Sequence, residues 1–374
     1  MTGYFIGLMS GTSLDGVDGV VLELSAQNMR VSHAHHVPMP ADLRRELLAL
    51  NTPGSNELHL ASLATNRLIQ CHAEVVHALL ALSGLHAADI TAIGVHGQTV
   101  RHMPGPVGAA VNAHQPWPAY SVQLCNPALL AELCGTAVIA DFRSRDIAAG
   151  GQGAPLVPAF HRAVFGRRSQ SVAVVNIGGM ANATLLGSDC EVSGFDTGPG
   201  NVLMDLWCEK HTGHTFDSNG QWAASGVCHT ALLNELLAEP FFSQRGVRST
   251  GRDLFNAAWL NAHLARYSSL SAADVQATLL ELTAHSIAQS LPEGLDSCVV
   301  CGGGALNPVL IGALQQLLGS TPVIPSDAVG MPAMQVEAAA FAWLAAQCWH
   351  GLPGNVPAAT GARGPRVLGA IYPA

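Results

Sequence analysis

The feature that most constrains the fold is a pattern found near the start of each half of the chain. An apolar strand, a glycine-rich turn and a second apolar strand follow one another. The first copy spans Tyr4–Leu24, with its turn at residues 10–16 (SGTSLDG). The second copy spans Ser171–Leu186, with its turn at Gly178–Asn182. Strand formers such as Val17 follow the turn, so the pattern predicts β-hairpins rather than the strand–turn–helix of a P-loop or Rossmann site.

Composition describes a compact folded protein without a polyanionic partner. The 374 residues exceed the usual length of one domain, and 49% are hydrophobic against 11% charged. The net charge of −9 and the lack of a basic run argue against nucleic acid and anionic membranes. Neither a signal peptide nor an apolar membrane span is evident. Nine cysteines, an odd number, fit free thiols in a reducing cytoplasm.

A run rich in glycine and proline, Ala148–Pro155, predicts a hinge between domains. We expect an N-terminal α/β lobe over residues 1–142, completed by residues 350–374, and a second α/β lobe over residues 143–349. The helices expected between strands include Ser121–Cys134, Leu254–Tyr267 and Ala333–Trp349.

The stretch Val192–Asp205 (VSGFDTGPGNVLMD) carries one carboxylate, Asp196, in what reads as a glycine-rich turn. Asn201 is a suitable N-cap for a helix over Val202–His211. A helix N-terminus under such a turn offers N–H groups to a phosphate, and Asp196 would suit a general base or a ligand of magnesium-bound water. The alternative is an ordinary turn in which Asp196 is a local cap.

Two other turns have the chemistry of nucleotide sites. Residues Gly11–Asp18 are dense in amides and hydroxyls, with Asp15 and Asp18 at the exit, and could hold phosphates and magnesium waters. Many hairpins carry such turns without a ligand. The glycines of Gly302–Asn307 would let a flat ring such as adenine approach the backbone. Cys298 and Cys301 have C-x-x-C spacing, but they lie on a buried strand, where no metal site is expected.

Polar side chains follow two further strands. His96, Gln98 and Thr99 follow the strand Asp89–Val95 and could read sugar hydroxyls, or form a polar loop with a satisfied histidine. Asp141 and Arg143 follow the strand Ala137–Ala140, and the arginine suits a carboxylate on a substrate.

An isolated carboxylate, Glu337, falls on the alanine-rich helix Ala333–Trp349. It is either solvated or directed into a cleft with a shifted pKa.

Taken together, these pieces resemble the anhydro-N-acetylmuramic acid kinase family, within the superfamily of sugar kinases, actin and heat-shock chaperone ATPases. The stretches that carry the resemblance are Gly7–Asp18, Gly94–His102, Asp141–Pro155, Asn176–Asn182, Gly194–Asp205, Arg248–Asn256 and Cys301–Asn307.

The resemblance implies an actin-like ATPase fold, duplicated and ribonuclease H-like. Each lobe would be a mixed five-stranded sheet flanked by helices, with a central cleft. It also implies ATP, magnesium held mainly through nucleotide phosphates and water, a homodimer, and cytoplasmic recycling of peptidoglycan sugars. Asp196 would be the catalytic base, with Glu337 as a second candidate. Contacts to the nucleotide are expected from Gly11, Thr12, Ser13, Leu14, Asp15, Gly16, Val17, Asp18, Gly178, Gly179, Asn182, Gly302, Gly303, Gly304 and Asn307. Contacts to the sugar are expected from His96, Gln98, Thr99, Asp141, Arg143, Gly198 and Gly200.

The chemistry implied by this resemblance differs from that of a common sugar kinase. A 1,6-anhydro sugar has no free O6 hydroxyl, so Asp196 would activate water to attack C1 while O6 takes the γ-phosphoryl group. One alternative is a kinase for another amino sugar with a free hydroxyl. Another is a nucleotide-dependent chaperone or regulator, although the chain has no long appended segment for a partner.

Overall fold

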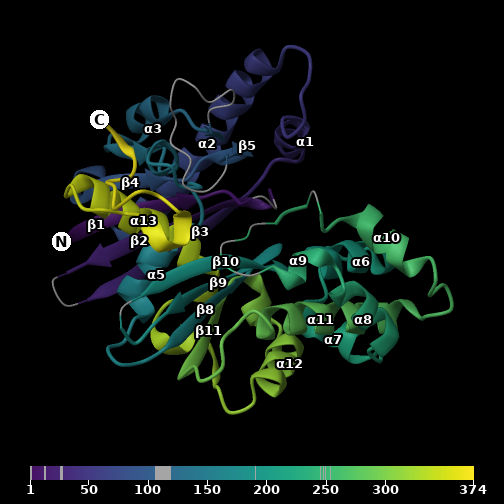
Figure 1. Ribbon diagram of the computed structural model, residues 1–374. Coiled ribbons are helices and arrows are strands. Elements are labelled where there is room, and N and C mark those ends of the chain that lie inside the picture. The colour runs from purple at the N-terminus through teal and green to yellow at the C-terminus, as the bar shows by residue number, and fades with distance from the viewer. Residues whose placement is uncertain are drawn as a thin grey trace. The chain divides into compact units, whose positions relative to one another are not determined.

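The computed structural model describes residues 2–11, 14–25, 28–105, 119–189, 191–244, 246, 248, 250–252 and 254–374. Thr12 and Ser13, both expected at the nucleotide, lie outside these ranges. The chain forms two compact units, Met1–Val164 with Gln335–Ala374, and Phe165–Met334 (Figure 1).

Both boundaries between the units differ from the expected lobes. Residues 143–164 belong to the first unit, and the chain returns to that unit at Gln335 rather than at residue 350. The glycine-rich run is tied to the C-terminal segment through the buried Asp146. Its Oδ1 accepts hydrogen bonds from Asn355 Nδ2 (2.7 Å) and Thr360 Oγ1 (2.8 Å). Ala148–Pro155 is therefore part of the first unit's interior and not the boundary between units.

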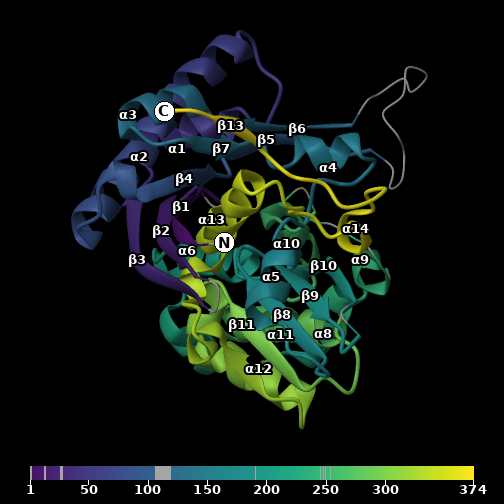
Figure 2. The ribbon, with the colours of Figure 1, turned by 90° about the vertical axis from the view of Figure 1, so that its left-hand side faces the viewer.

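The two units repeat one five-strand topology. The first has the strand order β7-β4-β1-β2-β3 and the second has β12-β11-β8-β9-β10. In each, three consecutive antiparallel strands are followed by two strands added in parallel. This repetition confirms the expected duplicated α/β fold with mixed sheets. The first sheet has a sixth strand, because β13 pairs with β7 (Figure 2).

The strands of the first unit are β1 (Gly3–Met9), β2 (Gly16–Leu24), β3 (Met29–Pro38), β4 (Ile90–Val95), β7 (Val138–Ala140) and β13 (Ala370–Tyr372), with the separate ladder β5 (Gln98–Met103) and β6 (Tyr120–Leu124). Its helices are α1 (Ala41–Ala49), α2 (Glu57–Ser83), α3 (Pro127–Cys134), α4 (Ser144–Ala148), α5 (Pro158–Phe165), α13 (Val336–Trp349) and α14 (Pro357–Thr360). None of the helices in the described ranges is long and apolar enough to span a bilayer.

Glycines bring two helices onto opposite faces of the first sheet. A Cβ on Gly7 would lie 1.9 Å from the carbonyl oxygen of Ala338 in α13. The next strand position faces the other side. There Leu8 pairs with Gly19, whose Cβ would lie 2.2 Å from Val75 of α2. Thus α13 and α2 cover opposite faces, and α13 rests directly on the strand backbone.

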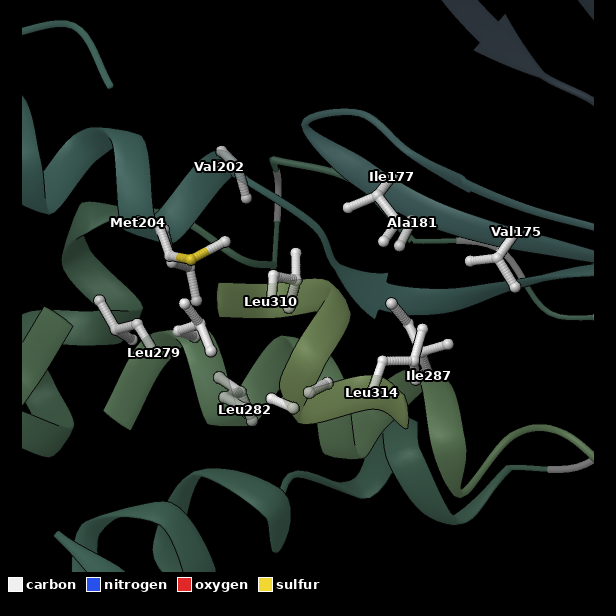
Figure 3. Close-up of a cluster of buried hydrophobic side chains, with 14 of the residues drawn as sticks. Val175, Ile177, Ala181, Val202, Met204, Leu279, Leu282, Ile287, Leu310 and Leu314 are labelled. Carbon is white, nitrogen blue, oxygen red and sulfur yellow. The ribbon is translucent and has the colours of Figure 1, made fainter. Parts of the chain in front are cut away.

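The second unit contains β8 (Val172–Ile177), β9 (Met180–Leu186), β10 (Val192–Pro199), β11 (Ser297–Cys301) and β12 (Val323–Pro325). Its helices are α6 (Val202–Thr212), α7 (Gln221–Ala224), α8 (Thr230–Leu237), α9 (Pro240–Ser243), α10 (Ala257–Leu264), α11 (Ala272–Ala288) and α12 (Pro308–Leu318). Figure 3 shows side chains of β8 and β9 in the same core as leucines of α11 and α12. The aliphatic strand residues are buried because helices cover them.

Two expected helices begin later than predicted. Over Ser121–Cys134, residues 120–124 form β6, and α3 begins only at Pro127, because Asn126 Oδ1 accepts the N–H of Leu129 (3.2 Å). Likewise, α10 begins at Ala257 and not at Leu254, because Asn256 is its N-cap.

We predict that Gly94→Ala destabilises the first unit by about 1–3 kcal/mol. A Cβ there would lie 2.1 Å from the carbonyl oxygen of Phe341, and a backbone atom of α13 cannot move aside alone. Gly312→Ala is the matched control, because no neighbouring atom lies within 4 Å in α12. It should stabilise by about 0.5–1 kcal/mol through helix propensity. Urea unfolding measures both changes, and equal midpoints for the two variants would contradict the close seating of α13.

Candidate active site

The turn between β1 and β2 is closed by its own backbone and carboxylate. Leu14 N–H donates to Gly11 O (3.2 Å), and Asp15 Oδ1 accepts from Gly16 N–H (3.1 Å). Leu14 and Val17 are buried in the core of the first unit. Of the expected nucleotide residues here, these two therefore offer a ligand only their backbone groups.

Glu337 lies in the first turn of α13, near the carboxylates that follow the β1–β2 turn. Burial and the proximity of Asp18 and Asp15 raise the pKa of Glu337, while Arg143 opposes this shift. Burial also raises the pKa of Asp18, although His36 Nδ1 lies 2.8 Å from its Oδ1 and lowers it. The side chain of Glu337 is half-buried, which argues against the fully solvated alternative.

In the first unit the buried His96 pairs with the half-buried Arg143. His96 stacks on Phe341 of α13, with ring centroids 4.8 Å apart. Its Nε2 lies 2.7 Å from Arg143 Nη2, and Arg143 Nη1 donates to Gly153 O (2.6 Å). A guanidinium can only donate, so His96 Nε2 accepts and the imidazole is neutral. Burial and Arg143 keep the pKa of His96 well below its usual value, and burial lowers the pKa of Arg143 to about 10.

The expected sugar residues do not all meet. Asp141 adopts a left-handed backbone conformation (φ 61°) and accepts a hydrogen bond from Ser144 Oγ (2.5 Å). It lines a cavity of about 270 Å³ with residues that include Gln123, but His96, Arg143 and Glu337 are not among the lining residues. Gln123 Nε2 donates to Thr99 Oγ1 (3.2 Å), so Thr99 is linked to the cavity of Asp141. Gln98 is buried, and its Oε1 has no partner among the described residues.

In the second unit, Asp196 lies on β10 rather than in a turn, which corrects the prediction. Asn182 of β9 is paired with both Asp196 and Asn176, so the three side chains share one face of the sheet. Asp196 Oδ2 accepts the N–H of Thr250 (2.9 Å), and Asp196 exchanges two hydrogen bonds with Arg248. The carboxylate is thus oriented by a segment 52 residues further along the chain.

Arg248 is a positioning residue that the sequence did not single out. It is only 8% exposed, and its guanidinium lies over the rings of Phe195 and Phe241, 5.3 and 5.2 Å from their centroids. It also donates to Gln244 O and Ser290 Oγ. A buried arginine with this many partners fixes the loop that holds Asp196. The signal in the sequence that could have pointed to Arg248 was its place in the motif Arg248–Asn256.

The residues at the start of α6 are bound to the preceding glycine turn. The amides of Gly200 and Val202 donate to Gly179 O (2.9 and 3.1 Å), and that of Asn201 donates to Gly178 O (2.8 Å). The Asn201 side chain makes no capping bond and donates to a β8 carbonyl instead. The glycine turn therefore binds three of the amides predicted for phosphate.

The glycines of the motifs fall into two kinds. Gly198 and Gly200 are required by packing, since a Cβ would lie 2.7 Å from Phe242 and 2.3 Å from Gly178 O, respectively. At Gly178 and Gly179 the nearest atoms are 3.6 and 3.9 Å away, and neither residue has a positive φ. The fold itself does not require glycine at these two positions.

The glycines of the third turn, Gly302–Asn307, also fall into a crowded and an uncrowded kind. A Cβ on Gly302 or Gly304 would lie 2.3 Å from Asn176 Oδ1 or from Ile177, whereas Gly303 has no atom closer than 3.5 Å. Asn307 caps α12 by accepting two backbone N–H bonds (3.1 Å each). Its side-chain oxygen is therefore already engaged.

A duplicated mixed sheet with a glycine turn in each half defines an actin-like ATPase fold. The family model described as anhydro-N-acetylmuramic acid kinase matches residues 3–374. Relatives of that name are 51% identical in Albidiferax ferrireducens (100% of both chains), 54% in Variovorax paradoxus (99% of both) and 50% in Pseudomonas putida (99% of both). The chain belongs to this kinase family, which confirms the resemblance in its motifs.

A further carboxyl of the second unit, Asp205 on α6, has a shifted pKa. Burial raises its pKa to about 7, Arg252 opposes the shift, and Asp217 and Glu209 add to it. Sequence inspection did not single out Asp205, because a carboxylate in the first turn of a helix is common.

We predict that Asp205→Asn stabilises the protein more at pH 8 than at pH 5. The ionised form is disfavoured in the fold, so the contribution of Asp205 to stability is full below its ordinary pKa of 3.8 and is lost as pH rises to about 7. The gain from the substitution should therefore grow by about 2–3 kcal/mol between the two pH values. Urea unfolding at both pH values measures it, and an equal gain at each would contradict the burial of this carboxyl.

Proposed function

We propose that this chain uses ATP and water to convert 1,6-anhydro-N-acetylmuramic acid into N-acetylmuramic acid 6-phosphate, with release of ADP. Membership in the kinase family over residues 3–374 supports the reaction class. The observation that carries the mechanism is the carboxylate of Asp196, oriented on β10 by Thr250 and Arg248.

The bonds balance in one concerted scheme. A water oxygen bonds to C1 of the sugar as the C1–O6 bond breaks, and O6 bonds to the γ-phosphorus as ADP leaves. The water gives one proton to Asp196, which acts as general base. A carboxylate held in a fixed orientation suits this role, because the attacking water must lie in line with the C1–O6 bond.

The first unit supplies groups suited to the sugar. Arg143 carries a half-buried positive charge, and the neutral His96 beside it can exchange hydrogen bonds without adding charge. We propose that Arg143 binds the lactyl carboxylate. Burial raises the pKa of Glu337 and so favours its protonated form, which can donate a hydrogen bond to O6 as the C1–O6 bond breaks. Glu337 keeps its proton, because O6 is captured by the γ-phosphoryl group.

Magnesium would be held mainly by nucleotide phosphates and water. No group of three or more metal-ligating side chains occurs in the described residues, and Asp15 and Asp18 fit the role of water ligands. When bound, magnesium neutralises charge on the transferring phosphoryl group. We also propose a cytoplasmic homodimer that serves peptidoglycan recycling.

Asp196→Asn should fold normally and bind ATP but lose turnover by about three decades or more, because the amide cannot accept the water proton. ADP release with the anhydro sugar measures this, and Asp189→Asn on an exposed turn is the control. Near-normal turnover would remove Asp196 from the mechanism. ADP release with N-acetylmuramic acid instead of the anhydro sugar would favour an ordinary sugar kinase.

Turnover in heavy-oxygen water shows whether water attacks C1 of the sugar or the γ-phosphorus of ATP. Turnover in H₂¹⁸O should place the label on C1 of the product, since water attacks there. Mass spectrometry of the separated sugar and phosphate locates it. Label on the phosphate would mean that water attacked phosphorus, and the proposed scheme would be wrong.

Glu337→Gln should change the pH profile as well as the rate. If protonated Glu337 donates a hydrogen bond to O6, wild-type kcat falls as pH rises through its raised pKa. The variant should have a lower kcat that no longer shows this alkaline limb. An unchanged alkaline limb in the variant would assign that ionisation to another group.

A further inference from the structure

The turn between β8 and β9 has a backbone donor, the N–H of Gly179, on the side that faces away from α6. Gly178 O is bound by Asn201 N–H. In a trans peptide the carbonyl and the following N–H point in opposite directions, so Gly179 N–H points away from α6. Within the described residues this amide has no hydrogen-bond acceptor.

Arg252 lies beside this surface. The atom nearest to a Cβ built on Gly179 is Arg252 Nη2, at 3.9 Å. The guanidinium has no ion-pair partner or hydrogen-bond acceptor in the described parts of the chain. Asp205 acts on it electrostatically but does not pair with it. The arginine therefore keeps a charge that is not neutralised by a direct contact.

These two observations are independent and point to the same ligand. Glycines without a packing reason leave room for a group to approach the backbone, and an unpaired arginine next to them favours an anion. We propose that Arg252 joins Gly179, already expected at the nucleotide, and binds a nucleotide phosphate together with the Gly179 N–H during phosphoryl transfer.

A phosphate fits this surface better than the carboxylate of the sugar. A guanidinium fork with a backbone N–H matches several phosphate oxygens at once. The sugar carboxylate already has a cationic partner in the proposed function, the half-buried Arg143. The inference rests on that proposed function and adds Arg252 to the residues that contact ATP.

The test compares ligand binding to Arg252→Gln and to wild type by calorimetry. The probes are the non-hydrolysable analogue AMPPNP with magnesium, and adenosine. AMPPNP should bind about 10–100-fold more weakly to the variant, as for a lost hydrogen bond to a charged group. Adenosine affinity should stay within about twofold. The control is Arg266→Gln, whose side chain is 79% exposed, and it should match wild type.

Gly179→Ala provides a second test that does not depend on charge. Its φ is ordinary and its Cβ has room, so the variant should keep the wild-type thermal midpoint. It should still weaken AMPPNP binding about tenfold or more, because the methyl group occupies the phosphate position.

Three results would overturn the inference. They are unchanged AMPPNP affinity in both variants, an equal loss for adenosine, or a higher KM for the sugar with AMPPNP affinity unchanged. The proposed function is tested separately, by turnover of wild-type protein with the anhydro sugar. If that turnover is normal and Arg252→Gln binds AMPPNP as wild type does, only the role of Arg252 fails.

Discussion

Three backbone hydrogen bonds between the start of α6 and the β8–β9 turn determine how the second unit presents its chemistry. Because the helix amides bind the turn carbonyls, the peptide planes of the turn are fixed, and its free amide faces the other way. Gly200 makes this approach possible, since any side chain there would collide with Gly178 O. Asp196 lies four residues before Gly200, so the same contact fixes the strand end that carries the carboxylate.

In the first unit, a close contact between helix α13 and the sheet plays a similar part. There α13 approaches β1 and β4 so closely that Gly7 and Gly94 are required. This contact places Phe341 against His96 and brings Glu337 near Asp18. In the first unit a helix thus reaches the strand backbone through glycine, and in the second unit the start of a helix reaches the β8–β9 turn through glycine. In each unit a carboxylate lies within four residues of the contact. Close backbone packing limits side-chain motion, which is what a base or acid with one working geometry needs.

The sequence predicted those elements whose signals are local. Hairpins, turns and long helices were found because strand formers, glycines and helical periodicity act over a few residues. The first part of the helix expected over Ser121–Cys134 was wrong, because β6 gains its strand pairing from β5, some 20 residues earlier, whereas the second part is α3. The hinge expected at Ala148–Pro155 failed for a similar reason. Its glycines serve packing against a segment about 200 residues away, through Asp146, and no local pattern reports that contact.

The sequence predicted which types of residue occur at the candidate site better than it predicted how they are arranged. His96 and Arg143 meet, but Asp141, two residues from Arg143 and in a left-handed backbone conformation, lines a cavity to which neither of them contributes. A glycine in a motif is equally ambiguous in sequence, since packing and ligand approach both select it. The structure separates the two causes: Gly198, Gly200, Gly302 and Gly304 are crowded by the chain itself, whereas Gly178, Gly179 and Gly303 are not. Selection for function should therefore act most directly on the uncrowded glycines, because a substitution there alters the approach of a ligand and leaves the fold intact.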